Sequence, residues 1–132
     1  MRILIADDND RVRSAIRAVL SHEDGLEVCG EATDGKQVLH QTRELLPDFV
    51  LLDVHMPGSD GFQVARKLRL EFPTIKIIIM SHDDAAMVST IAFESGAADC
   101  IDKAYLATEL TPRLRRLLGA HNAAPNTGGV RG

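Results

Sequence analysis

The feature that most constrains the fold is a regular alternation of short apolar runs with longer stretches of helical spacing. Four of the runs are continuous enough to form strands buried on both faces, as in parallel sheets, and they occupy residues 2–6, 48–52, 75–80 and 98–101. In a fifth run, 26–32, Leu26 and Val28 alternate with more polar residues. This alternation predicts an edge strand with one face toward solvent.

A helical stretch follows each run, with apolar residues three and four positions apart. Asn9 or Asp10 suits the N-cap of the first helix, and Gly96 suits the C-cap of the fourth. Pro112 falls within the fifth stretch, where it is expected to delay the helix or kink it. Strand followed by helix, five times over, predicts an α/β fold: a doubly wound parallel sheet of five strands with five helices on its two faces.

Composition sets the class of protein. The 132 residues suit one compact domain, and 45% apolar with 26% charged residues exclude a largely disordered chain. A net charge of −4 makes the chain a poor nucleic-acid binder by itself. No apolar run approaches the ~20 residues of a membrane span. Cys29 and Cys100 lack metal-ligand spacing and are expected to be reduced residues of a cytoplasmic protein.

The apolar pattern stops after Leu118. Residues 119–132 hold four of the ten glycines of the chain, together with Pro125 and two asparagines. Such a composition cannot bury a core. We therefore expect one domain over 1–118, followed by a linker or a disordered tail over 119–132.

Acidic residues end two of the predicted core strands. Asp7 and Asp8 follow the first strand and Asp53 follows the third. Doubly wound sheets bind ligands at the carboxyl ends of their strands, near the point where the strand order reverses. With the order 2-1-3-4-5 the two strands are neighbours, and the three carboxylates share one pocket. Their repulsion favours a divalent cation, and oxygen ligands suit Mg²⁺ or Mn²⁺ better than zinc. The alternative is that these aspartates only cap helices or turns.

Two further polar residues end the remaining core strands. Ser81 follows the fourth strand and could turn its hydroxyl into the same pocket, although alone it would be an N-cap. Lys103 follows the fifth strand and can neutralise an anion, although alone it would be a solvated surface charge. The set as a whole indicates a site that binds a cation together with an anionic group.

These motifs resemble the receiver domain of two-component response regulators over residues 1–118. The resemblance lies in the pair Asp7-Asp8, the stretch from Asp53 to Gly61, then Ser81, then Lys103. It implies a flavodoxin-like fold with the sheet order 2-1-3-4-5. The stretches 30–32 and 95–99 further resemble the subfamily whose receivers precede a LuxR-type helix-turn-helix output domain.

The resemblance implies a role for each of these residues. Asp53 would accept a phosphoryl group from a sensor histidine kinase, and the chain would be a phosphoacceptor rather than an enzyme. Asp8 would bind Mg²⁺ directly and Asp7 through water, with Asp53 and the backbone carbonyl of His55 as further ligands. Ser81 and Lys103 would hold the phosphoryl oxygens and switch the domain, consistent with phosphoryl transfer by positioning and charge neutralisation.

The same resemblance implies the partners. A sensor histidine kinase would supply the phosphoryl group, and phosphorylation would favour a homodimer. DNA would be bound only through an output domain absent from this chain. The isolated chain is therefore expected not to bind DNA.

Three residues depart from the receiver pattern. Cys100 stands where many receivers carry a Tyr or Phe that switches rotamer, and Ala104 stands where many have a cis proline. A non-proline peptide bond is expected to be trans. His82 stands where receivers usually have a small residue.

Three neighbours of the expected phosphorylation site are further candidates. We hypothesise that His55 and His82 partly cover Asp53 and, with Asp83, tune the access of phosphodonors and water. The alternative is that all three are solvated loop side chains.

Two other functions remain open at this level. One is an interaction module that keeps the fold without taking phosphate. The other is a haloacid-dehalogenase-type phosphatase, whose Asp-x-Asp motif is present as Asp8-Asn9-Asp10. Such enzymes usually have a longer chain, and the lysine after the fifth strand suits a receiver better.

Overall fold

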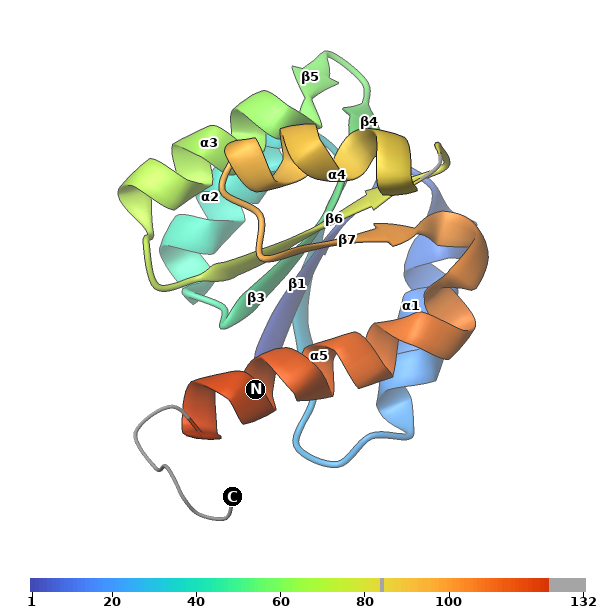
Figure 1. The fold of residues 1–132 in the computed structure, drawn as a ribbon. Helices are drawn as coiled ribbons and strands as arrows, with labels where there is room; N and C mark the ends of the chain where they lie inside the picture. The colour runs from blue at the N-terminus through green and yellow to red at the C-terminus, as the bar shows by residue number, and fades with distance from the viewer. Residues whose placement is uncertain (84, 124–132) are drawn as a thin grey trace.

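The computed structural model describes residues 1–83 and 85–123 and has one central parallel sheet (Figure 1). Five strands lie in the order β2-β1-β3-β6-β7. Their bounds are β1 Arg2–Ala6, β2 Glu27–Ala32, β3 Phe49–Asp53, β6 Lys76–Ser81 and β7 Asp99–Asp102. This is the predicted order 2-1-3-4-5, with β2 as the predicted edge strand. The flavodoxin-like prediction is confirmed.

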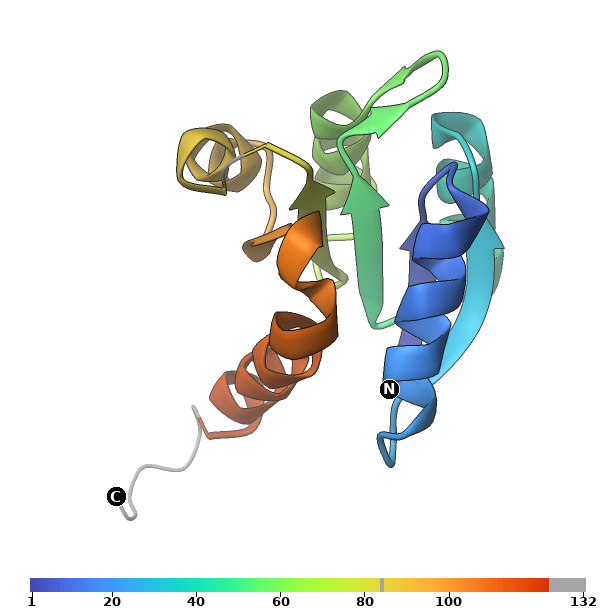
Figure 2. The ribbon, with the colours of Figure 1, turned by 90° about the vertical axis from the view of Figure 1, so that its right-hand side faces the viewer.

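Five α-helices cover the two faces of this sheet. They are α1 Asp10–Ser21, α2 Gly35–Leu45, α3 Gly61–Glu71, α4 Ala85–Glu94 and α5 Leu106–Ala123. Helices α1 and α5 lie on one face, and α2, α3 and α4 lie on the other (Figures 1 and 2). Since every connection between neighbouring strands passes through a helix, all five strands point the same way.

The core forms two layers because successive strand residues point to opposite faces. On β1, Leu4 packs toward α2, α3 and α4, whereas Ile3 and Ile5 pack toward α1 and α5. All five residues of β3 are buried, as expected of a central strand. This two-sided burial explains why the central strands are continuous apolar runs in the sequence.

Local capping fixes where the helices next to the site begin and end. Asn9, one of the two predicted candidates, caps α1 by accepting hydrogen bonds from the N–H groups of Arg11 and Val12. Gly96 follows α4 with a φ of +99°, a conformation that suits glycine. The side-chain stem of Arg69 packs against its Cα, at a point where a Cβ would clash.

Three features differ from the expectations. A small antiparallel hairpin, β4 His55–Met56 with β5 Ser59–Asp60, lies between β3 and α3, and a short 3₁₀ helix, η1 Lys103–Tyr105, precedes α5. Helix α5 begins six residues before Pro112, so the proline does not delay its start. Pro112 has no N–H to donate to the carbonyl of Thr108, four residues earlier. Thr108 is exposed, so water can donate to this carbonyl instead.

The end of α5 also differs from the expected domain boundary. The helix continues to Ala123, so residues 119–123, expected in the tail, are helical. The rest of the expected tail, 124–132, lies outside the described residues. Among the residues that the structure describes, no helix has the length and apolar character needed to cross a membrane.

Candidate functional site

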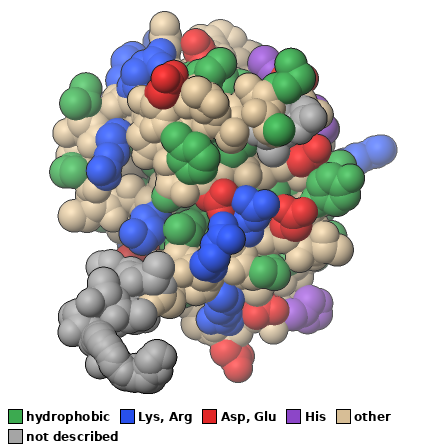
Figure 3. Space-filling model, in the orientation of Figure 1, with side chains coloured by type: hydrophobic (Ala, Val, Ile, Leu, Met, Phe, Trp, Pro, Cys, Tyr) green, Lys and Arg blue, Asp and Glu red, His purple; other side chains and the backbone are tan. Residues whose placement is uncertain are grey.

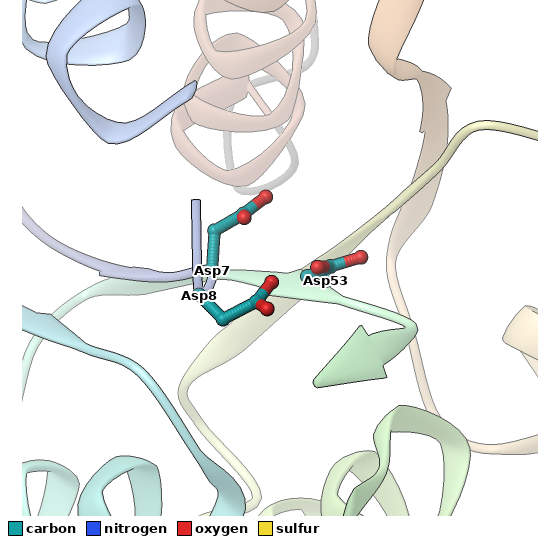
Figure 4. Close-up of side chains that lie close together, drawn as sticks. All are labelled: Asp7, Asp8 and Asp53. Atoms are coloured by element: carbon teal, nitrogen blue, oxygen red, sulfur yellow. The ribbon is translucent and has the colours of Figure 1, made fainter. Parts of the chain in front are cut away.

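The site lies at the carboxyl edge of the sheet, where three aspartates converge (Figure 4). Asp7 and Asp8 follow β1, and Asp53 is the last residue of the neighbouring strand β3. One carboxylate oxygen from each lies within 4.8 Å of the others. Asp7 and Asp53 are buried, whereas Asp8 is exposed. The structure therefore brings together the three carboxylates that the sequence placed at one edge.

Lys103 reaches this cluster from the end of the edge strand β7. Its Nζ lies 2.6 Å from Asp7 Oδ2 and 3.0 Å from Asp53 Oδ1, and its side chain is only 5% exposed. The lysine follows β7, which is separated from β3 by β6. One ammonium thus faces two buried carboxylates, with a third carboxylate beside them.

The two oxygens of Asp53 have different surroundings. Oδ1 accepts the backbone N–H of His55 at 3.1 Å and also contacts Lys103. Within the described residues, no hydrogen-bond partner is found for Oδ2. Burial raises the pKa of Asp53 above its ordinary value, against the opposing effects of Lys103 and the His55 N–H, and the nearby Asp7 charge raises it further. Oδ2 is therefore the oxygen open to a ligand or an electrophile.

This raised pKa predicts a pH-dependent stability. The folded state keeps the Asp53 proton to a higher pH than the unfolded state, so its contribution to stability is lost as the pH rises through the folded-state pKa. We expect Asp53→Asn, which cannot ionise, to melt higher than the wild type at pH 7 in EDTA. A gain of about 1 kcal/mol would give about 4 °C. Thermal melts should show this difference shrinking toward pH 4; a constant difference would contradict it.

Four further candidate residues lie at or just after the ends of β3 and β6, at the same edge of the sheet. Ser81, the last residue of β6, is buried, and its Oγ accepts the backbone N–H of Asp83 at 3.0 Å. Asp83 Oδ2 lies 3.7 Å from His55 Nε2, and both side chains are largely exposed. His82 is exposed as well. His55 and Asp83 thus lie together at the surface beside Asp53, Ser81 is buried at the end of β6, and His82 is exposed next to Ser81.

Arg13 is a site residue that the sequence analysis missed. Its Nη1 donates to the backbone carbonyl of Asp7 at 2.7 Å, and its Nε donates to Glu31 at 2.8 Å. The same guanidinium is paired with Asp10 on α1. Arg13 therefore holds the turn that carries the acidic pair. The only sequence signal was the charge pair Asp10 and Arg13 three residues apart, which is common on helices.

The acidic cluster fits a divalent cation. Three carboxylates face one ammonium, so the group retains an excess of negative charge. Asp7 Oδ2 is buried and forms an ion pair with Lys103. Among the described residues, no group donates a well-aligned hydrogen bond to this oxygen. Carboxylate oxygens at this density are the ligands that hard cations prefer. The three aspartates could therefore bind a metal ion.

The departures from the receiver pattern also have definite places. Cys100 is buried in β7, and burial raises the pKa of its thiol. The peptide bond between Lys103 and Ala104 is trans, as expected. Ala104 belongs to η1, so a short helical turn follows the lysine here.

The fold and the site together define a doubly wound α/β domain with an acidic cluster and a lysine at the carboxyl edge of its sheet. The chain belongs to the response regulator receiver domain family, whose model matches residues 3–115. It is the receiver domain of a two-component response regulator. The family match leaves no support for the dehalogenase-type alternative.

Individual relatives agree with this assignment. The chain is 37% identical to the response regulator GacA of Pseudomonas viridiflava, over 87% of this chain and 54% of that protein. It is 39% identical to the probable transcriptional regulatory protein NarL of Mycobacterium tuberculosis H37Rv, over 83% of this chain and 51% of that one. The chain therefore spans about half the length of these relatives.

Solved structures show the same fold. A LuxR-family two-component response regulator from Aurantimonas sp. SI85-9A1 superposes with a TM-score of 0.84 at 28% identity, covering 90% of this chain and 85% of that one. The signal receiver domain of the putative response regulator NarL from M. tuberculosis gives 0.80 at 34% identity, covering 88% and 94%. The resemblance to LuxR-type regulators is thereby confirmed.

Proposed function

We propose that Asp53 accepts a phosphoryl group from the phosphohistidine of a sensor histidine kinase, with Mg²⁺ bound at Asp7, Asp8, Asp53 and the His55 carbonyl. The single observation that carries this proposal is the convergence of three carboxylates and Lys103 on one edge of the sheet. Asp53 Oδ2, without a hydrogen-bond partner among the described groups, is the attacking atom. Manganese, an oxygen-preferring cation, is expected to substitute for Mg²⁺.

The transfer itself needs positioning and charge neutralisation. Asp53 Oδ2 forms the new bond to phosphorus while the P–N bond to the kinase imidazole breaks, and the electron pair stays on the leaving nitrogen. Lys103 moves its interaction from Asp53 Oδ1 to a phosphoryl oxygen, because its ammonium already lies between Asp53 and Asp7. A bound Mg²⁺, which Asp7 and Asp8 would hold, would supply further positive charge.

Labelling by a small phosphodonor tests the proposal. The chain is incubated with acetyl phosphate and Mg²⁺, and its intact mass is measured. One added phosphoryl group is expected with Mg²⁺ and none with EDTA. Asp8→Ala should need a much higher Mg²⁺ concentration for the same labelling, because it removes a direct ligand. A wild-type chain that takes no phosphate under any of these conditions would instead be an interaction module.

We further propose that Ser81 couples phosphorylation to the neighbouring loop. Its Oγ now accepts the N–H of Asp83 at 3.0 Å. A phosphoryl oxygen on Asp53 would be a stronger acceptor for the Ser81 hydroxyl. Rotation of this hydroxyl would release Asp83 and the start of α4. The loop would then have two arrangements, which the phosphoryl group selects.

The exposed rim residues should control access to Asp53. We expect His82→Ala to be labelled faster by acetyl phosphate than the wild type, because less bulk would stand over the carboxylate. Labelling rates at pH 6 and pH 8 provide the measurement. Equal rates for both proteins at both values would mean that His82 neither blocks nor tunes the site.

The relatives support a proposal about the biological setting. We propose that the chain acts in the cytoplasm as the receiver part, residues 1–118, of a longer transcription regulator. The support is its coverage of about half of GacA and NarL, so that nearly half of each relative lies outside the match. DNA binding would belong to an output domain joined through the segment after α5. Phosphorylation would favour a homodimer.

The receiver by itself is expected not to bind DNA, because its net charge is −4. A gel-shift assay at ~0.15 M salt should therefore show no shifted DNA.

A further inference from the structure

Arg13 connects the turn after β1 to both α1 and β2. Its Nη1 donates to the backbone carbonyl of Asp7 at 2.7 Å, and its Nε donates to Glu31 Oε1 at 2.8 Å. Its Nη2 is paired with Asp10 on the same helix. Each of the three guanidinium nitrogens has a partner, and the three partners belong to different segments of the chain.

Arg13 differs from the arginines that form surface ion pairs. Positive and negative side chains are interspersed over α5, in the lower half of the face that Figure 3 shows. The other arginines in described ion pairs have side chains that are 29% to 67% exposed, whereas the Arg13 side chain is 13% exposed. Exposed pairs contribute little to stability. A largely buried guanidinium that donates to a backbone carbonyl instead holds that peptide in one orientation.

The peptide bond between Asp7 and Asp8 is fixed through Asp7. The Asp7 N–H donates to the carbonyl of Ala32 in β2 at 3.0 Å, and Asp7 Oδ1 accepts the N–H of Asn9 at 2.8 Å. The Asp7 carbonyl accepts from Arg13. The carboxylate of Asp8 is exposed and has no hydrogen bond or ion pair among the described residues. The backbone that precedes it therefore decides where this carboxylate lies.

A peptide bond is planar, so the direction of the Asp7 carbonyl also sets the direction of the chain at Asp8. The Asp8 side chain extends from this peptide toward Asp53 (Figure 4). We propose that Arg13 is a positioning residue for the cation: it holds the Asp7–Asp8 peptide so that the Asp8 carboxylate can bind a metal ion together with Asp7 and Asp53. The inference rests on the cation site of the proposed function.

The charge of Arg13 and its positioning role have opposite effects on cation affinity. A guanidinium repels a nearby divalent cation, so removal of its charge alone would strengthen cation binding. Loss of positioning would weaken binding, since removing a group that orients metal ligands typically lowers affinity about 10-fold to 100-fold. The sign of the change in Arg13→Met therefore distinguishes the two effects.

Binding of Mn²⁺ to the whole chain, without a phosphodonor, tests the proposal. Free Mn²⁺ is measured by its electron paramagnetic resonance signal, because the chain has no tryptophan that could report binding by fluorescence. We expect Arg13→Met to raise the Mn²⁺ dissociation constant about tenfold. Arg13→Lys should also raise it, because lysine keeps the charge but lacks the planar fork that reaches both the Asp7 carbonyl and Glu31. An affinity equal to or above that of the wild type in these variants would overturn the proposal.

Arg17→Met is the matched control. Arg17 lies one helical turn after Arg13, and its Nη1 donates to the other carboxylate oxygen of Glu31 at 2.8 Å. Its described partner is Glu31, and the Asp7 carbonyl is held by Arg13. Arg17→Met removes the same charge and should change the Mn²⁺ dissociation constant by less than about twofold, as expected for an exposed ion pair. Equal weakening in Arg13→Met and Arg17→Met would overturn the role of the Asp7 carbonyl contact.

Two further outcomes separate this inference from the proposed function. A wild type that binds no Mn²⁺, or binds it no better than Asp8→Ala, would overturn the cation site and the role of Arg13 together. Mn²⁺ binding that needs Asp8 but is unchanged in Arg13→Met would overturn the role of Arg13 alone. Circular dichroism at the binding temperature shows whether each variant is folded, and Arg13→Lys carries the test if Arg13→Met does not fold. A lower melting temperature with an unchanged dissociation constant would leave Arg13 a purely structural role.

Discussion

Asp53→Asn should take no phosphoryl group from acetyl phosphate, whereas the wild type takes one. Asp53 is the last residue of β3, and among the described residues its Oδ2 has no hydrogen-bond partner, whereas Asp7 Oδ2 lies 2.6 Å from Lys103 Nζ. Asparagine keeps the size of the side chain and can still accept from the His55 N–H. The change therefore removes the nucleophile with little change of shape. Intact mass after incubation with Mg²⁺ and acetyl phosphate is the measurement.

The exposed aspartate at the α3 N-cap provides a matched control. Asp60 lies in the same loop region, caps α3 through the Phe62 N–H and is not part of the acidic cluster. Asp60→Asn should be labelled as the wild type is, because an asparagine can also cap a helix. Full labelling of Asp53→Asn, or equal loss in both variants, would contradict the assignment of Asp53.

Lys103→Met should lower the stability of the metal-free protein strongly. The substitution removes the ammonium that contacts the buried carboxylates of both Asp7 and Asp53, and no other cation among the described residues contacts both. Removing one partner from a buried ion pair typically costs about 3–5 kcal/mol. We expect a loss near the lower value, since Asp53 can take up a proton. Thermal melts and urea unfolding in EDTA measure the change.

Added Mg²⁺ should return much of this stability. A cation that binds the folded state alone stabilises it by about 2.7 kcal/mol at one hundred times its dissociation constant. With the ammonium gone, the three carboxylates should bind Mg²⁺ more tightly than in the wild type. Lys67→Met, at an exposed lysine of α3 that forms no described ion pair, should change neither property. An Mg²⁺-independent stability of Lys103→Met would show that the cation does not bind at this cluster.

The sequence by itself determined the order of elements and the place of the acidic cluster. Strands covered on both faces must be continuous apolar runs, so β1, β3 and β6 were evident without coordinates. Parallel strands end at a common edge of the sheet, so the residues that follow neighbouring strands lie close together. For the same reason Asp7, Asp8 and Asp53 could be grouped before their distances were known. The hairpin β4–β5 escaped prediction because strands of two residues have no measurable period.

Only the tertiary structure decided how the charges at this edge are shared. Neighbouring strands lie about 4.8 Å apart, so Lys103, which follows β7, must reach past the end of β6 to contact Asp53. Its long side chain and the position of η1 allow this contact. Arg13 holds Asp7 through a backbone carbonyl, a contact that no residue pattern encodes. Sequence periodicity describes each element against the core, whereas contacts between elements depend on the crossovers that place them.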